Sequence, residues 1–225
     1  MTGLRAPWPT VRRPDRETYG GNQGDFARKG IRVSGCGLIA VLDTLRYLWK
    51  ARPDCRADFF SRDLPEPLPW AKYETLGLAL NRRYVPLFPP FGANGIGLAW
   101  GMNRFFRRYR MPLRAHWGVK KARLWDTMTR MLEQNLPVIF SIGPNWPRLW
   151  GRKGVGLYRS PGDVSPVTHV NRHYVTVTGL DEQWLRVSSW GRRYYIRRAE
   201  FENYVNQYSC NLFSNCLILK EVRHD

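Results

Sequence analysis

The chain has 225 residues, of which 43% are hydrophobic and 14% aromatic. This composition supplies a sizeable core for one domain and excludes a disordered chain, which would be poorer in such residues. No stretch approaches the ~20 apolar residues that cross a membrane. Residues 1–21 also lack the apolar region of a secretory signal. We therefore expect a cytoplasmic protein with no transmembrane segment.

The net charge of +18 raises the question of a nucleic-acid partner, because clustered cations gain affinity by displacing phosphate counterions. The 36 basic residues are mostly arginines, and they lie in short pairs along the whole chain, such as Arg82-Arg83 and Arg192-Arg193. No nucleic-acid motif accompanies them. The pattern favours a solvated basic surface and leaves nucleic acid, acidic substrates and membrane surfaces as alternative partners.

The first predicted helix begins near residue 34, after an irregular segment over residues 1–33 that is rich in proline and glycine. Apolar residues then recur at spacings of three and four, which places them on one helical face: Leu38, Val41, Leu42, Leu45 and Leu48. Ser34 is the predicted N-cap, because its hydroxyl can accept from free amides of the first turn. Cys36 would then lie in that first turn.

Further along the chain, helical spacing predicts helices over 70–83, 98–109 and 122–134, and apolar runs predict strands over 113–117 and 136–142. Residues 143–168 are rich in glycine and proline and indicate a surface loop. Alternating residues then predict strands over 173–180, 184–188 and 194–197, followed by a helix over 198–206 and a strand over 212–220.

Helices gathered in the first half and strands in the second predict an α+β fold with an antiparallel sheet. We expect one domain over residues 1–225. It divides into an irregular part (1–33), a mainly helical part (34–142), a loop (143–168) and a β-rich part (169–225).

The four cysteines match no zinc-binding spacing, so neither a metal nor a cofactor is expected. Cys55, Cys210 and Cys216 are interpreted as ordinary reduced thiols. Cys36 differs because Gly35 and Gly37 flank it at a predicted helix N-terminus. Free amides and the helix dipole at such a position favour a thiolate, and the Cys36 amide is placed to donate to an oxyanion.

A nucleophilic cysteine needs an imidazole to take its proton. His173 opens the predicted strand over 173–180, where its side chain can reach a helix end, and His169 in the preceding loop is the competitor. His116 lies in a predicted strand and is assigned a structural role. His224 is next to the C-terminus and is expected to be solvated.

Three segments in this order resemble papain-like cysteine peptidases, most closely the bacterial bacteriocin-processing (double-glycine) peptidase-like group. They are Ser-Gly-Cys-Gly over 34–37, His-Tyr-Val-Thr-Val-Thr-Gly over 173–179 and Ser-Ser-Trp-Gly over 188–191. The resemblance implies a nucleophile helix packed on a C-terminal antiparallel sheet. It also implies Cys36 as nucleophile, His173 as base and Ser188 as the residue that orients the imidazole, or Ser189 if the register slips by one.

The family places Asn or Asp at the orienting position and a glutamine about half a dozen residues before the cysteine. Here the orienting residue is a serine, and Gln23 stands thirteen residues before Cys36. By the resemblance, Gln23 is the oxyanion donor, with Asn22 as a substitute.

The function expected from this set is a cysteine hydrolase, a peptidase or amidase that works through a thioester. Three alternatives remain: an acyltransferase with the same Cys/His pair, a non-catalytic papain-like binding protein, and a basic nucleic-acid-associated protein of another fold.

Overall fold

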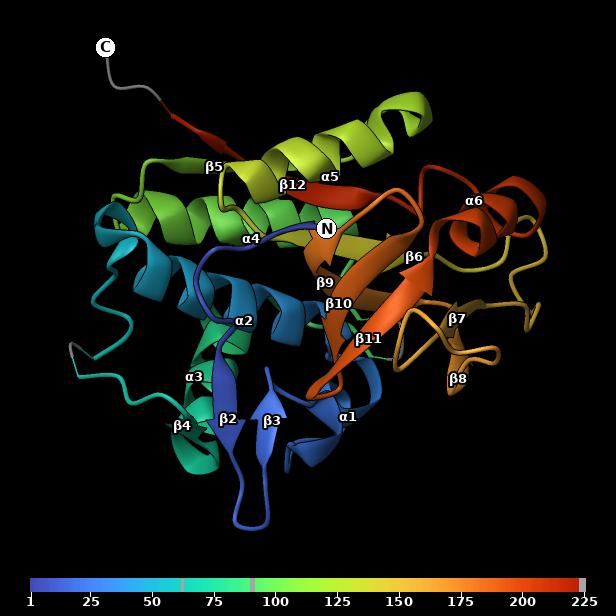
Figure 1. Cartoon of the computed structure of the whole chain (residues 1–225). Helices are drawn as coiled ribbons and strands as arrows, with labels where there is room; N and C mark the ends of the chain where they lie inside the picture. The colour runs from blue at the N-terminus through green and yellow to red at the C-terminus, as the bar shows by residue number, and fades with distance from the viewer. Residues whose placement is uncertain (62, 90–91, 223–225) are drawn as a thin grey trace.

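The computed structural model describes residues 1–61, 63–89 and 92–222. Its central element is an antiparallel sheet in the strand order β11-β10-β9-β6-β12-β5, and β1 also pairs with β9 (Figure 1). The strands of this sheet are β1 (Thr2–Gly3), β5 (Leu113–Trp117), β6 (Val138–Ile142), β9 (His173–Leu180), β10 (Trp184–Ser189), β11 (Arg192–Arg197) and β12 (Cys216–Glu221).

Helices cover both faces of the sheet. They are α1 (Lys29–Ser34), α2 (Cys36–Ala51), α3 (Trp70–Arg83), α4 (Gly95–Arg108), α5 (Leu124–Glu133) and α6 (Arg198–Gln207). Helices α2 and α4 pack on one face, whereas α5 and α6 meet on the other through Trp125 and Phe201 (Figure 1). Within the described residues, none of these helices has the length and apolarity needed to cross a membrane.

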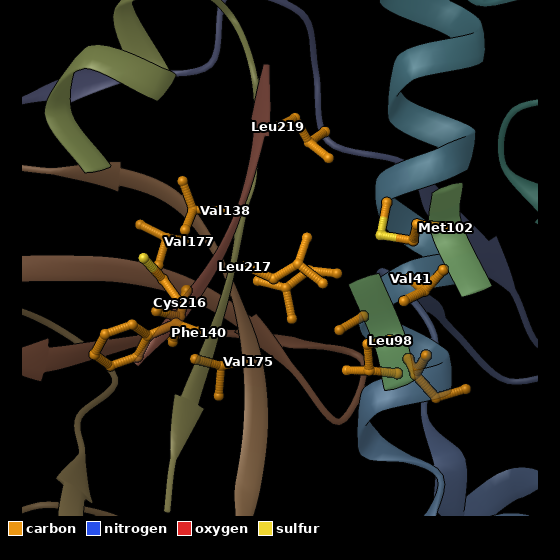
Figure 2. Packing of buried hydrophobic residues seen from close by; sticks show 14 of the residues in the cluster. Val41, Leu98, Met102, Val138, Phe140, Val175, Val177, Cys216, Leu217 and Leu219 are labelled. Atoms are coloured by element: carbon orange, nitrogen blue, oxygen red, sulfur yellow. The ribbon is translucent and has the colours of Figure 1, made fainter. Parts of the chain in front are cut away.

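The alternation of β12 explains why both faces are covered. Leu217 and Leu219 point toward Leu98 and Met102 of α4, whereas Phe140 of the adjacent strand β6 lies on the opposite side (Figure 2). All five side chains are buried. Because successive side chains of a strand point to opposite faces, a strand that is apolar throughout needs packing partners on both sides.

The α+β prediction is confirmed, and several elements have the predicted bounds. The helix over 70–83 and the strands over 113–117 and 173–180 begin and end where the sequence places them. Helix α4 begins three residues earlier than predicted because the Asn94 side chain accepts from the Gly97 amide at 2.7 Å. This side-chain cap satisfies one of the free amides at the helix start.

Two segments that were predicted to be irregular contain regular structure. Residues 1–33 include β1, the hairpin β2 (Thr10–Arg12) and β3 (Glu17–Tyr19), the 3-10 turn η1 (Gln23–Asp25) and the start of α1. Strand β2 also pairs with β4 (Leu68–Pro69). The loop over 143–168 contains β7 (Val155–Leu157), which pairs with β8 (Thr168–Val170). These strands have three residues or fewer, too short for the period-two alternation that the prediction relied on.

Two further 3-10 turns, η2 (Pro53–Cys55) and η3 (Lys121–Arg123), complete the described elements. The turn η3 leads directly into α5, so the predicted helix over 122–134 begins as a tighter turn.

Candidate active site

One small cavity at the N-terminus of α2 brings the predicted site residues together. Cys36, His173, Ser188, Ser189 and Gln23 all line it. The volume open to the centre of a water molecule is about 10 Å³, which is room for about one water. Residues that lie 150 positions apart in the sequence therefore share one site.

Cys36 begins α2 at a sharp junction with α1. The Gly35 amide donates to the Ile31 carbonyl at 2.8 Å and so ends α1, and Cys36 is the next residue. The predicted N-cap is wrong: Ser34 is the last residue of α1, and its hydroxyl donates back to the Gly30 carbonyl at 2.8 Å. Gly35 takes the cap position instead, with no side-chain cap.

Packing around the two glycines beside Cys36 is tight, and at Gly35 it leaves no room for a side chain. A Cβ at Gly35 would lie 2.4 Å from the Ile31 carbonyl oxygen, and a Cβ at Gly37 would lie 3.1 Å from the Leu98 side chain and 3.3 Å from that of Tyr174. The Gly-Cys-Gly pattern thus allows α1, α4 and β9 to close around the start of α2.

The Cys36 thiol is half-buried, and burial raises its pKa. The backbone amides of Tyr174, Gly37 and Cys36 itself oppose this shift, because they favour the thiolate. The expectation of a lowered thiol pKa from the helix N-terminus is therefore wrong for this geometry. The desolvation of the thiol outweighs the three amides, and at neutral pH the cysteine is protonated.

His173 is buried, and its ring is held on two sides. Nε2 lies 2.7 Å from the Ser189 hydroxyl, and the ring packs against Trp190, tilted by 32°, with 4.4 Å between ring centroids. Burial lowers the pKa of His173 from 6.5 to about 4, since no charged partner compensates for it. The imidazole is neutral at neutral pH, and its other nitrogen, Nδ1, makes no hydrogen bond within the described part of the chain.

The hydroxyl that meets His173 belongs to Ser189 and not to Ser188. Ser188 pairs with Thr176 of β9 and donates to the Tyr19 carbonyl at 3.0 Å. Ser189 is the last residue of β10, before a two-residue turn in which Trp190 and Gly191 both have positive φ. This turn type joins two antiparallel strands tightly. It places Ser189 and Trp190 together at the imidazole.

Gln23 lies in η1, at the edge of the same cavity. Its side-chain amide donates one hydrogen bond to the Arg32 carbonyl at 3.0 Å, and the second N–H of that amide remains for a ligand. The proposed substitute, Asn22, instead accepts from the Gly24 amide at 3.0 Å and so caps η1. Gln23 lines the cavity that holds Cys36, and Asn22 is not among the residues that line it.

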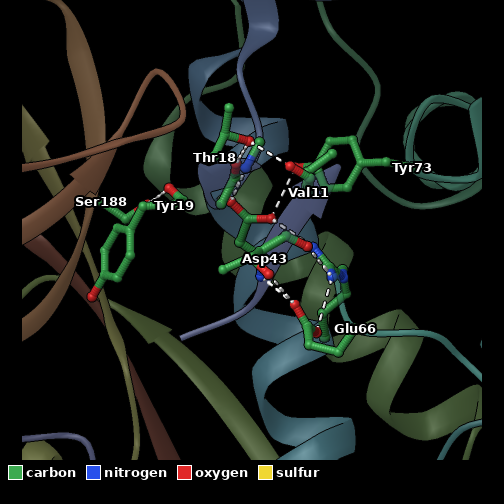
Figure 3. Close-up of polar contacts among 11 residues, drawn as sticks. Val11, Thr18, Tyr19, Asp43, Glu66, Tyr73 and Ser188 are labelled. Carbon is green, nitrogen blue, oxygen red and sulfur yellow. Dashed lines mark hydrogen bonds and ion pairs between the residues drawn. The ribbon is translucent and has the colours of Figure 1, made fainter. Parts of the chain in front are cut away.

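Asp43 is a buried member of the cavity wall that the sequence reasoning missed. Its carboxylate accepts from the Gly21 amide at 2.8 Å and from the Tyr73 hydroxyl at 2.9 Å, and Arg46 lies 3.7 Å away (Figure 3). Burial raises the pKa of Asp43 to about 6, against the opposing charge of Arg46. The network fixes the turn that leads to Gln23. An Asp inside an apolar helix, three residues before an Arg, was the available signal.

The remaining histidines lie elsewhere. His169 is exposed in β8, in a pocket that it shares with Trp150 and Arg172, and does not line the Cys36 cavity. His116 is in β5, as predicted, and His224 lies outside the described residues. Among residues 1–61, 63–89 and 92–222, no three His, Cys, Asp or Glu side chains gather as a metal site.

Two comparisons of the sequence with known proteins were made, and neither found a relative. A scan against protein-family models finds no match, and a search of curated proteins finds none either. The site must therefore be interpreted from its own chemistry. It holds a thiol beside backbone N–H donors, a neutral imidazole that is hydrogen-bonded to a hydroxyl, and the side-chain amide of Gln23 in the cavity wall.

Proposed function

We propose that the protein is a cysteine hydrolase with a papain-like fold that cleaves a peptide or another amide through a thioester. The observation that carries this proposal is the shared cavity of Cys36 and His173, with Ser189 and Trp190 holding the imidazole. The chain order of thiol, imidazole and orienting residue, and the packing of the nucleophile helix on an antiparallel sheet, also support it.

Because thiol and imidazole are both neutral at rest, the proposed mechanism starts with general-base catalysis. His173 takes the thiol proton while the Cys36 sulfur bonds to the amide carbon. The carbonyl oxygen becomes an oxyanion, which the Cys36 amide and Gln23 stabilise. The imidazolium then protonates the leaving nitrogen, the C–N bond breaks, and a thioester remains.

Water resolves the thioester in the second half of the reaction. His173 takes a proton from the water as the hydroxide adds to the thioester carbon. The C–S bond then breaks, the imidazolium returns the proton to the Cys36 sulfur, and the product leaves as a carboxylic acid that gives its remaining proton to solvent. If an amine enters in place of water, the same residues perform acyl transfer. The Ser189 hydroxyl brings no negative charge to stabilise the imidazolium, and this feature favours the second candidate, a non-catalytic binding protein on the same fold.

Alkylation with iodoacetamide distinguishes these candidates. Cys210 is half-buried like Cys36 and is the internal control thiol. With His173 as base, Cys36 reacts at neutral pH faster than Cys210, as measured by peptide mass spectrometry over time. His173→Ala removes this difference, whereas the matched variant His169→Ala, which changes an exposed histidine off the site, keeps it. Equal rates for the two thiols in the unmodified protein would refute a catalytic pair.

A further inference from the structure

A basic groove runs between α5 and the β12–β5 edge of the sheet, separate from the Cys36 cavity. Four cations line it: Lys120, Arg123, Arg130 and Lys220. Its apolar lining consists of Val119, Met131 and Ile218, and its volume is about 390 Å³. This volume lies in the range of ligand sites.

The register between β12 and the edge strand β5 adds further positive charge beside the groove. Arg114 of β5 is directly opposite Lys220 of β12, and His116 is opposite Ile218. Directly opposed residues share one face of a sheet, so Arg114 and His116 lie on the face that the groove occupies. Burial, and then the charges of Lys220 and Arg114, lower the pKa of His116. The positive charge at this edge is therefore concentrated in space and does not depend on the histidine.

These cations are not neutralised by neighbours. Within the described residues, none of the five forms an ion pair, and no Asp or Glu lines the groove. Elsewhere in the described residues, some buried or half-buried arginines have carboxylate partners, such as Arg46 with Asp43. Other arginines, such as Arg32 and Arg186, donate to backbone carbonyls instead. Five like charges side by side lower stability by mutual repulsion, so the arrangement indicates an external anion.

We propose that this groove binds the phosphodiester backbone of a single-stranded nucleic acid, a property beyond the hydrolase function. A nucleic acid carries one negative charge per nucleotide and matches a groove whose described lining holds four cations and no Asp or Glu. A concave groove accepts a narrow chain, whereas a flat bilayer surface does not enter it. The described residues that line the groove include no aromatic side chain, so the proposed binding uses no base stacking and is independent of sequence.

The test is fluorescence anisotropy with labelled oligo(dT) and the full chain over a range of salt concentrations. Five contacts predict a slope of log affinity against log salt of about −3.5, since each contact on a single strand contributes about 0.7. The groove variant Arg123→Gln/Arg130→Gln loses two contacts, so the slope falls to about −2.1 and the affinity at 0.1 M salt falls about 25-fold.

The matched control is Arg192→Gln/Arg193→Gln, which removes the same charge from β11, the opposite edge of the sheet. At 0.1 M salt, charges more than about 10 Å from the ligand are screened, so the control keeps the original slope. Both pairs are exposed, and unchanged melting temperatures verify that the variants fold. If the two variants lose affinity equally, the groove is not the site. Tighter binding of a poly-glutamate peptide or of anionic phospholipid vesicles than of oligo(dT) would also overturn the proposal.

Discussion

Replacing Ser189 by aspartate tests the link between burial and charge at His173. The pKa of His173 falls from 6.5 to about 4 in the folded protein, so protonating the buried ring costs about 3 kcal/mol. Ser189→Asp puts a carboxylate where a hydroxyl now lies 2.7 Å from Nε2. At about 4 Å and an effective dielectric constant of about 20, a carboxylate stabilises the imidazolium by about 4 kcal/mol. This energy corresponds to about 3 pH units and raises the pKa to about 7.

The assay is a pH titration of the histidine ring signals by NMR, with the His173 signal assigned by its loss in His173→Ala. Ser189→Asn is the control, because it keeps a hydrogen-bonding side chain beside Nε2 without a charge. We expect the pKa of His173 to stay well below 6 in the unmodified protein and in Ser189→Asn, and to rise above 6 in Ser189→Asp. The reasoning is refuted if the unmodified His173 titrates near 6.5, or if Asp and Asn have the same effect in folded protein.

Four other outcomes follow from the structure. Ser189→Asp also speeds alkylation of Cys36 at pH 6 relative to Ser189→Asn, because the imidazolium then stabilises the thiolate. Trp190→Ala opens His173 to solvent and raises its pKa toward 6.5 in the same NMR titration. Leu217→Ala lowers the free energy of unfolding by about 2–5 kcal/mol in urea titrations, because it empties a fully packed position between the sheet and α4. Asp43→Asn makes the stability rise more steeply with pH, by about 1.4 kcal/mol per unit between about pH 4 and 6, in urea unfolding at a series of pH values.

Asp43 and His173 change the pH dependence of folding stability in opposite directions. The pKa of His173 is lowered in the folded state, so its contribution to stability is present above pH 6.5 and is lost as the pH falls toward 4. The pKa of Asp43 is raised to about 6, so its contribution is present below about pH 4 and is lost as the pH rises through 6. The two slopes oppose each other between about pH 4 and 6. A variant without the Asp43 titration therefore leaves the His173 slope uncompensated, and an unchanged slope would contradict the assigned shifts.

The spacing of apolar residues was sufficient to predict the bounds of some of the longer helices and strands. The helix over 70–83 and the strand over 173–180 have the predicted bounds because each is long enough for its apolar spacing to be repeated. The hairpin of β2 and β3 was missed because three-residue strands have no period to detect, and tertiary contacts such as the pairing of β2 with β4 stabilise them. The N-cap prediction for Ser34 was wrong for a different reason. Residues 29–34 form the short helix α1, so Ser34 ends that helix and does not cap the next one.

For the candidate site, the residue types could be predicted from the amino-acid pattern alone: a cysteine between glycines, a histidine at a strand start, and a pair of serines before Trp-Gly. The fold was needed to show that the Ser189 hydroxyl, and not that of Ser188, meets His173, because adjacent side chains of a strand point in opposite directions. It also decided the charge states, since the pKa values of Cys36 and His173 depend on burial by distant segments. The basic groove likewise exists only in the fold, which brings Arg114, Arg130 and Lys220 together from separate elements.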